Sequence, residues 1–257
     1  MAFINIGFFS ETLGVETSCH VILPQPKHLE EAAGKRYPVL WLLHGAYGSY
    51  HDWTRFTSIE RYVRTLGLCV VMPSAQNSGY LNMAHGGRYY SYIAEELPKK
   101  MREFFPLSDK REDNFIAGLS MGGEGALMFG LSKPENYSVI GCLSAGMPEE
   151  TLRIHAPFLS AELDGTPYEK TYRDAQYNAQ RIVNEGLPCP RIYHTCGNED
   201  FLLDRAHRTR DFFESFQGNP FDYCYEEDAG THSWEYWDEH IQHFLRYLNL
   251  KPDIEYS

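Results

Sequence analysis

Three residues of this chain have the types and the order that nucleophilic acyl chemistry requires. Ser120 lies within GLSMGG (residues 118–123), Asp200 ends GNED (residues 197–200), and His232 follows AGT (residues 229–231). A serine hydroxyl is a poor nucleophile unless a histidine takes its proton, and a carboxylate must orient the imidazole and stabilise its charged form. Each residue comes just after an expected strand, in the order Ser, Asp, His. The sequence therefore predicts a catalytic triad that attacks a carbonyl carbon.

The surroundings of Ser120 predict a sharp turn between a strand and a helix. A Gly-x-Ser-x-Gly pattern alone is weak, because glycine and serine are common in ordinary turns. Residues 114–118 are short and mostly apolar, as in a buried strand, and residues 125–132 are compatible with a helix. Gly118 and Gly122 would avoid clashes at such a turn. The amide of Met121 would then lie at a helix N-terminus, where it favours a developing negative charge.

A second N–H donor to the developing negative charge is expected after the apolar run YPVLWLL (residues 37–43). This run is typical of a strand covered on both faces. The run leads into His44-Gly45-Ala46, and a glycine-rich loop there can bring another amide beside the serine. We expect the N–H of Ala46 to complete the oxyanion hole. The alternative is an ordinary strand-to-helix turn. His44 is expected to be structural.

Other acids and histidines compete for the roles of Asp200 and His232. Asp204 is expected inside a helix, and Glu199 should point away from Asp200. Three histidines are also expected within helices, where surface or packing roles are usual: His207, His240 and His243. The last two can share one side of a helix, but the sequence supplies no third ligand, so no metal site is expected.

The elements that must position these residues alternate between short apolar runs and helix-compatible segments. This alternation predicts an α/β fold with a mostly parallel central sheet flanked by helices. The first two strands should pair antiparallel around Gly14, and Pro98 should kink or break a helix over about 89–105. Strands are expected at 3–9, 19–23, 37–43, 68–72, 114–118, 137–143, 191–196 and 221–225, and further helices from 57 or 58 to 66 and at 125–132, 172–183, 201–216 and 234–248.

The length of 257 residues predicts one domain, 1–257, in which residues 147–187 form a cap over the active site. Three aromatic residues near the expected loops could line an acyl or aromatic pocket, with core packing an equal alternative: Trp53, Tyr80 and Trp234.

Composition excludes several function classes. The net charge is −12 and the basic residues are scattered, which argues against nucleic acid or an anionic membrane as a partner. No signal peptide or membrane-spanning stretch is apparent, so a soluble cytoplasmic protein is expected. The six cysteines contain no C-x-x-C pair, which favours reduced thiols over zinc or disulfides.

Several stretches together resemble the esterase D and tributyrin-esterase group of α/β-hydrolases, which is related to the feruloyl and acetyl-xylan esterases of carbohydrate esterase family 1. The most specific of them are FIAGLSMGG (115–123), CGNEDFL (196–202) and GTHSWEYW (230–237). The resemblance implies an α/β-hydrolase fold and a serine esterase without cofactor. It also implies that Ser120 is the nucleophile, His232 relays the proton, Asp200 orients His232, and Met121 and Ala46 donate to the oxyanion.

The function expected from these features is hydrolysis of short-chain acyl or hydroxycinnamoyl (feruloyl) esters, which are small-molecule substrates, through an acyl-serine intermediate. A thioesterase resembling S-formylglutathione hydrolase is an alternative, as is an acyltransferase. A catalytically inactive binding module is an alternative of another class, although a complete triad argues against it. Acyl-chain preference, the alcohol or sugar moiety and assembly into a homo-oligomer stay open.

Overall fold

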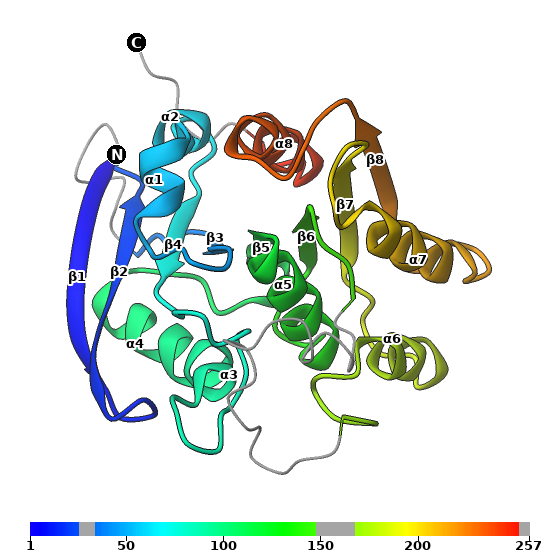
Figure 1. Ribbon diagram of the computed structural model, residues 1–257. Coiled ribbons are helices and arrows are strands. Elements are labelled where there is room, and N and C mark those ends of the chain that lie inside the picture. Colours follow the sequence, from blue (N-terminus) through cyan, green and yellow to red (C-terminus); the bar gives the residue numbers. More distant parts are fainter. Residues whose placement is uncertain (26–33, 148–167, 252–257) are drawn as a thin grey trace.

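The computed structural model describes residues 1–25, 34–147 and 168–251. Its centre is one sheet of eight strands in the order β1-β2-β4-β3-β5-β6-β7-β8 (Figure 1). The pairs β1–β2 and β2–β4 are antiparallel and the other neighbours are parallel. The strands are β1 (Ala2–Ser10), β2 (Val15–Leu23), β3 (Val39–Leu43), β4 (Cys69–Pro73), β5 (Asn114–Leu119), β6 (Val139–Leu143), β7 (Arg191–Gly197) and β8 (Cys224–Asp228).

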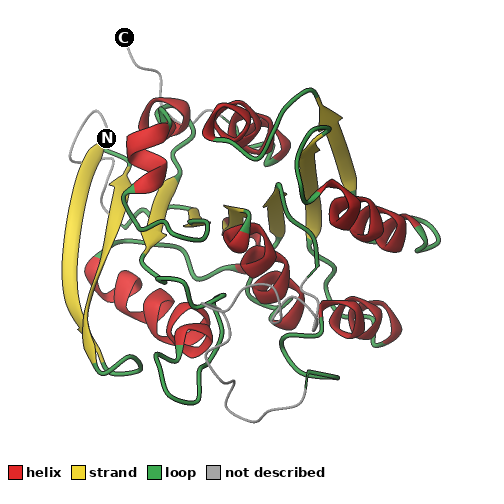
Figure 2. Cartoon of the chain, viewed as in Figure 1, coloured by secondary structure: helices red, strands yellow, loops and turns green. Residues whose placement is uncertain are grey.

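Helices cover both faces of this sheet (Figure 2). One hydrophobic core joins one sheet face to side chains of α1, α2 and α8, and a second joins the other face to α3 through α7. The helices are α1 (Asp52–Phe56), α2 (Ile59–Val63), α3 (Tyr89–Ser91), a π-helical turn (Tyr92–Glu96), α4 (Leu97–Phe104), a 3₁₀ turn (Arg111–Asp113), α5 (Met121–Ser132), α6 (Ala175–Asn184), α7 (Leu203–Glu214) and α8 (Trp234–Tyr247).

The continuously apolar sequence of strand β3 is explained by its packing on both faces of the sheet. Trp41 and Leu43 pack in the core beneath α5, whereas Leu40 and Leu42 pack in the core beneath α8. Successive side chains of a strand point to opposite faces, so a strand with helices on both sides has no polar position. The prediction of a doubly covered, mostly parallel sheet is therefore confirmed.

Most predicted elements are present, including the antiparallel first pair with Gly14 at φ +69° between its strands. The helix expected over 89–105 is continuous from Tyr89 to Phe104 and contains the π-helical turn, which ends two residues before Pro98. The last strand was expected at 221–225, and this placement is wrong. Asn219 and Asp222 have φ values of +46° and +42° and form a turn, so pairing with β7 starts only at Cys224.

The expected cap, residues 147–187, lies partly outside the described residues. Its described end contains α6, whose buried Ala175, Ala179 and Ile182 belong to the same core as α5. That part of the segment is therefore a helix of the main α/β layer. All six cysteines are free thiols. Among the described residues, no helix combines the length and the apolar character needed to cross a membrane.

Candidate active site

Ser120 occupies a strained turn between β5 and α5. Its backbone has φ +51° and ψ −122°, a conformation that costs a non-glycine residue about 1–3 kcal/mol. The turn is held because the Ser120 N–H donates to Leu143 O at 2.8 Å and the Glu124 N–H donates to Ser120 O at 3.0 Å. The hydroxyl is thereby lifted above the end of the sheet at the start of a helix.

Two glycines make this turn sterically feasible, as the sequence predicted. A Cβ atom at Gly118 would lie 2.5 Å from the carbonyl carbon of Gly122. A Cβ atom at Gly122 would lie 2.6 Å from Leu43 O, so helix α5 starts in direct contact with the backbone of β3. Side chains at either position would push α5 away from the sheet and displace Ser120.

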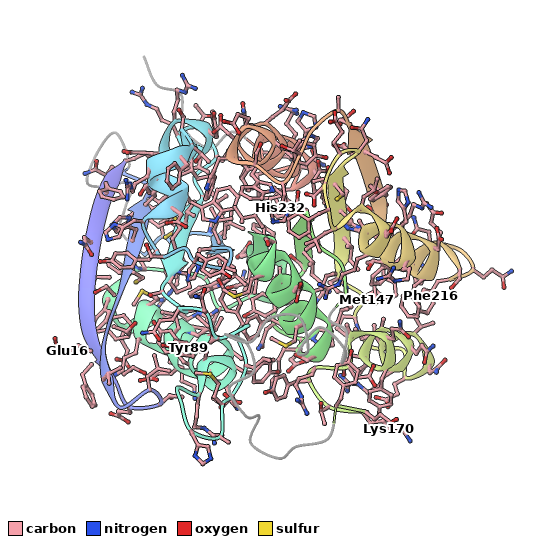
Figure 3. The ribbon with its side chains drawn as sticks, in the orientation of Figure 1. Glu16, Tyr89, Met147, Lys170, Phe216 and His232 are labelled. Atoms are coloured by element: carbon pink, nitrogen blue, oxygen red, sulfur yellow. The ribbon has the colours of Figure 1, made fainter. Side chains whose placement is uncertain are left out.

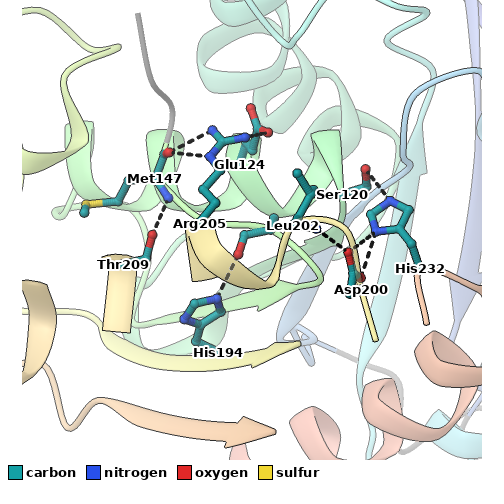
Figure 4. Close-up of polar contacts among 10 residues, drawn as sticks. Ser120, Glu124, Met147, His194, Asp200, Leu202, Arg205, Thr209 and His232 are labelled. Carbon is teal, nitrogen blue, oxygen red and sulfur yellow. Dashed lines mark hydrogen bonds and ion pairs between the residues drawn. The ribbon is translucent and has the colours of Figure 1, made fainter. Parts of the chain in front are cut away.

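Ser120, His232 and Asp200 form one hydrogen-bonded row (Figure 4). His232 Nε2 lies 3.0 Å from Ser120 Oγ, and His232 Nδ1 lies 3.0 and 2.9 Å from the two carboxylate oxygens of Asp200. Because an ionised carboxylate only accepts hydrogen bonds, Nδ1 carries the proton and Nε2 presents its lone pair to the serine hydroxyl. This is the arrangement in which an imidazole can remove the serine proton.

The side chain of Asp200 is fully buried, and that of His232 is 17% exposed. Burial by itself raises the pKa of Asp200, but hydrogen bonds from His232 and from the Leu202 N–H lower it by more, so the net pKa lies below its ordinary value. Asp200 therefore stays ionised and can stabilise a positive charge on the imidazole.

Two aromatic residues that the sequence analysis did not assign to the site hold the imidazole of His232. Phe201 lies with its ring centroid 4.4 Å from that of His232, and Trp237 meets the same ring edge-on at 5.0 Å. Phe201 is 75% exposed although it is a large hydrophobic residue. Its position directly after Asp200 was the available signal, because adjacent residues share one loop. Figure 3 shows His232 between α8 and the start of α5.

The predicted oxyanion donors lie on two segments that meet at Ser120. Met121 is the first residue of α5, so its N–H has no acceptor within the helix. Among the described residues, neither the Met121 N–H nor the Ala46 N–H donates a hydrogen bond to a backbone or side-chain acceptor. A Cβ atom at Gly45 would lie 3.6 Å from Ser120 Cβ, so the loop of Ala46 lies against the serine.

The loop of Ala46 is fixed by His44, as its expected structural role requires. The Nδ1–H of His44 donates to Gly45 O at 2.7 Å, and Nε2 accepts the Ala75 N–H at 2.9 Å. The Tyr80 hydroxyl donates to His44 O at 2.8 Å. Burial lowers the pKa of His44, which keeps the ring neutral and able to accept from Ala75.

The sequence was also compared with known protein families. Residues 10–248 match the Esterase family. The chain belongs to that family. An acetyl esterase of Caldicellulosiruptor saccharolyticus is 31% identical, with 98% of this chain and 100% of the relative aligned.

Two solved structures from Staphylococcus aureus are similar to this esterase. Both are 32% identical and cover 96% of this chain and 98% of their own. The fluorophosphonate-binding serine hydrolase F has a TM-score of 0.87, and the S-formylglutathione hydrolase FrmB has a TM-score of 0.82. The chain is thus a serine esterase with the α/β-hydrolase fold, related to carbohydrate esterase family 1, as the resemblance in its sequence predicted.

The rival acids and histidines of the esterase do not contact Ser120. Glu199 is exposed, and Asp204 lies in the first turn of α7. His207 bonds Glu227, His243 bonds Glu226, and His240 stacks on Tyr236. Within the described ranges, the hydrogen bonds of Ser120 Oγ lead to His232 alone.

The aromatic residues proposed for a pocket need correction. Trp53 is buried and its Nε1–H donates to Leu43 O at 3.0 Å, while Tyr80 is buried beneath His44. Neither exposes a surface to a ligand, so the core-packing alternative applies to both. Trp234 is partly buried and stacks on Phe56 at 5.0 Å, which makes it part of the contact between α1 and α8.

Helix α7 of the esterase also holds the chain where the expected cap begins. The guanidinium of Arg205 donates to Met147 O from Nε at 3.0 Å and from Nη2 at 2.7 Å, and it pairs with Glu124 of α5 (Figure 4). The Met147 N–H donates to Thr209 Oγ1 at 2.9 Å. Helix α5, which begins after Ser120, and helix α7, which follows Asp200, are therefore both linked to Met147.

Proposed function

We propose that this esterase hydrolyses carboxylic esters with short acyl groups through an acyl-serine intermediate on Ser120. The observation that carries the proposal is the 3.0 Å contact between His232 Nε2 and Ser120 Oγ, with Asp200 bonded to the opposite ring nitrogen. The acetyl esterase relative supports the short acyl group, because the alignment covers that protein completely.

In the acylation step, His232 Nε2 takes the Ser120 proton as Oγ attacks the carbonyl carbon of the ester. The carbonyl π bond opens, and the resulting oxyanion accepts hydrogen bonds from the N–H groups of Met121 and Ala46. Asp200 stabilises the imidazolium through Nδ1. When the tetrahedral intermediate collapses, the bond to the alcohol oxygen breaks and His232 donates its proton to that oxygen.

Deacylation repeats these steps with water as the nucleophile. His232 removes a water proton, the hydroxide oxygen attacks the acyl carbon, and the same two amides receive the oxyanion. Collapse breaks the bond to Ser120 Oγ, which regains its proton from His232. The products are a carboxylic acid and an alcohol, and the chemistry uses no group beyond water and the chain's own side chains and amides.

Hydroxycinnamoyl esters are a second candidate class, because aromatic surface is available beside the triad. Phe201 is exposed next to His232, and Tyr47, directly after Ala46, is 77% exposed. The Tyr47 N–H donates to Asn77 Oδ1 at 2.6 Å, so its backbone is fixed beside the proposed oxyanion hole. A planar acyl group could lie against either ring.

The test is a steady-state comparison of the wild type and Ser120→Ala on p-nitrophenyl acetate, butyrate and octanoate, methyl ferulate and S-formylglutathione. The proposal predicts that kcat/KM is highest for acetate or butyrate and that Ser120→Ala abolishes turnover of every substrate. Highest activity on methyl ferulate would favour the second class. Turnover of S-formylglutathione alone would contradict the ester proposal, and turnover that survives in Ser120→Ala would contradict the proposed nucleophile.

A further inference from the structure

A cluster of two histidines and one carboxylate lies between β8 and α8, outside the hydrogen-bonded row of Ser120. His240 and His243 are one turn apart on α8, and Glu226 faces them from β8. One ring nitrogen of each histidine and one carboxylate oxygen of Glu226 lie within 4.8 Å of one another. The i, i+3 histidine pair is visible in the sequence, but its third partner becomes apparent only when β8 pairs with β7.

The distances suit a single small cation. His243 Nδ1 lies 2.9 Å and His240 Nδ1 lies 3.8 Å from Glu226 Oε2. Zinc binds imidazole nitrogen and carboxylate oxygen at about 2.0–2.2 Å, so the ligand atoms of a tetrahedral site are about 3.3–3.6 Å apart. All three ligand atoms lie within 4.8 Å of one another, so the widest pair would have to close by about 1.2–1.5 Å, shared between two side chains, to bring the three atoms onto one ion.

The groups behind these ligands would orient them. The hydroxyl of Tyr193 donates to Glu226 Oε2 at 2.6 Å. His240 Nε2 lies 3.7 Å from Asp228 Oδ2, so when Nδ1 faces the ion the other ring nitrogen faces a carboxylate. Histidine ligands of metal sites commonly donate their second N–H to such a carboxylate, which fixes the ring and raises its basicity.

The cluster is also accessible from outside. His240 is buried, whereas the side chains of Glu226 and His243 are 36% and 28% exposed. Solvent can therefore reach the outer side of the cluster.

We propose that Glu226, His240 and His243 bind one zinc-like divalent transition-metal ion. Two imidazoles and one carboxylate match the ligand preference of Zn²⁺, with water completing the coordination. The ion would join β8 to α8 and so close the segment 226–243, which carries His232 on the loop between the two elements (Figure 1). Its role is to stabilise that segment, since the three ligands make no contact with Ser120.

The test uses calorimetric titration with Zn²⁺, visible absorption of bound Co²⁺ and thermal unfolding with and without Zn²⁺, all on chelator-treated enzyme. The protein is first labelled at Ser120 with an organophosphonate, which covers the imidazole of His232 and prevents the ion from binding there. The proposal predicts one ion per chain, a cobalt spectrum of low coordination number and a higher Tm with Zn²⁺. Affinity should fall at least about 10-fold in Glu226→Gln and in His243→Gln.

The matched control is His207→Gln. His207 Nε2 lies 2.6 Å from Glu227 Oε2, on the next residue of β8, and that pair belongs to no three-ligand group among the described residues. The control should keep the wild-type affinity. The proposal is overturned if the wild type binds no Zn²⁺, or if His207→Gln weakens binding as much as His243→Gln does. Metal-free thermal unfolding checks that each variant is folded, and His243→Asp, which restores a ligand, should recover part of the affinity.

Discussion

The N–H of Glu199 donates to the carbonyl oxygen of Gly230 at 2.9 Å, which joins the loop of Asp200 to the loop of His232. The Asn198 N–H makes a second bond of this kind to Asp228 O, also at 2.9 Å. The relative position of the proposed acid and base is therefore set by backbone hydrogen bonds at the ends of β7 and β8, in addition to the bond between their side chains.

This contact predicts that Gly197→Ala impairs catalysis. A Cβ atom at Gly197 would overlap the carbonyl oxygen of Gly230 and lie 2.6 Å from its carbon, so the two loops must separate. A displacement of about 1 Å in an active site can cost about 100-fold in rate, and we expect kcat to fall by about 10- to 100-fold. Steady-state kinetics on p-nitrophenyl acetate would measure it.

The control for that variant is Gly7→Ala on the edge strand β1. The nearest atom to a Cβ at Gly7 is Ser18 Oγ at 3.6 Å, an ordinary contact. Activity of Gly7→Ala should equal that of the wild type. Equal activity of Gly197→Ala and the wild type would show that the backbone contact does not set the triad geometry.

Asp200→Asn should lower kcat by about 10⁴-fold while KM changes little. The amide can donate to His232 Nδ1, which would leave the Nε2 proton facing Ser120 and remove the acceptor that the serine needs. Glu199→Gln is the matched control, because Glu199 is exposed beside Asp200, and it should be nearly as active as the wild type. A similar loss in both variants would point to general damage to the loop.

The sequence predicted the turn at Ser120 and the doubly covered strand β3 well because their signals are local. The glycines around Ser120 are needed within a few residues of the strained turn, and the uninterrupted apolar run of β3 reflects two covered faces. The aromatic residues could not be assigned in the same way. Trp53 and Tyr80 are buried and their polar atoms donate to the backbone carbonyls of Leu43 and His44, and these contacts between separate elements leave no local pattern.

The acid dependence of stability should include a contribution from His194. This residue is fully buried between the Tyr223 hydroxyl at 2.7 Å and Ala145 O at 2.9 Å, and burial lowers its pKa from 6.5 to about 4. The unfolded chain then binds a proton that the folded chain does not, so stability is lost as the pH falls from 6.5 towards 4. The loss is about 3 kcal/mol.

Urea unfolding at several pH values in this range would measure that slope. His194→Gln should be less stable at neutral pH but should show a flatter decline on acidification, because the titrating group is gone. An identical pH dependence in both proteins would mean that other groups account for the acid sensitivity.

Arg205→Ala should destabilise the fold by about 3–5 kcal/mol. The Arg205 side chain is only 5% exposed, and its loss leaves the Glu124 carboxylate and the Met147 carbonyl without their donor. Arg210→Ala is the control on the same helix. Its partner Asp211 is 65% exposed, so the expected change stays within about 1 kcal/mol. Chemical unfolding of both variants at neutral pH would measure the difference, and equal values would contradict the role given to Arg205.

Ser120 as the nucleophile is the central claim, and intact-mass spectrometry of the acyl-enzyme tests it most directly. The enzyme is mixed rapidly with excess p-nitrophenyl acetate, quenched in acid and weighed, alongside Ser120→Ala and His232→Ala. The account predicts an acetyl adduct in the wild type that peptide mapping places on Ser120, and no adduct in Ser120→Ala. An adduct of equal yield in Ser120→Ala, or one mapped to another residue during turnover, would contradict it.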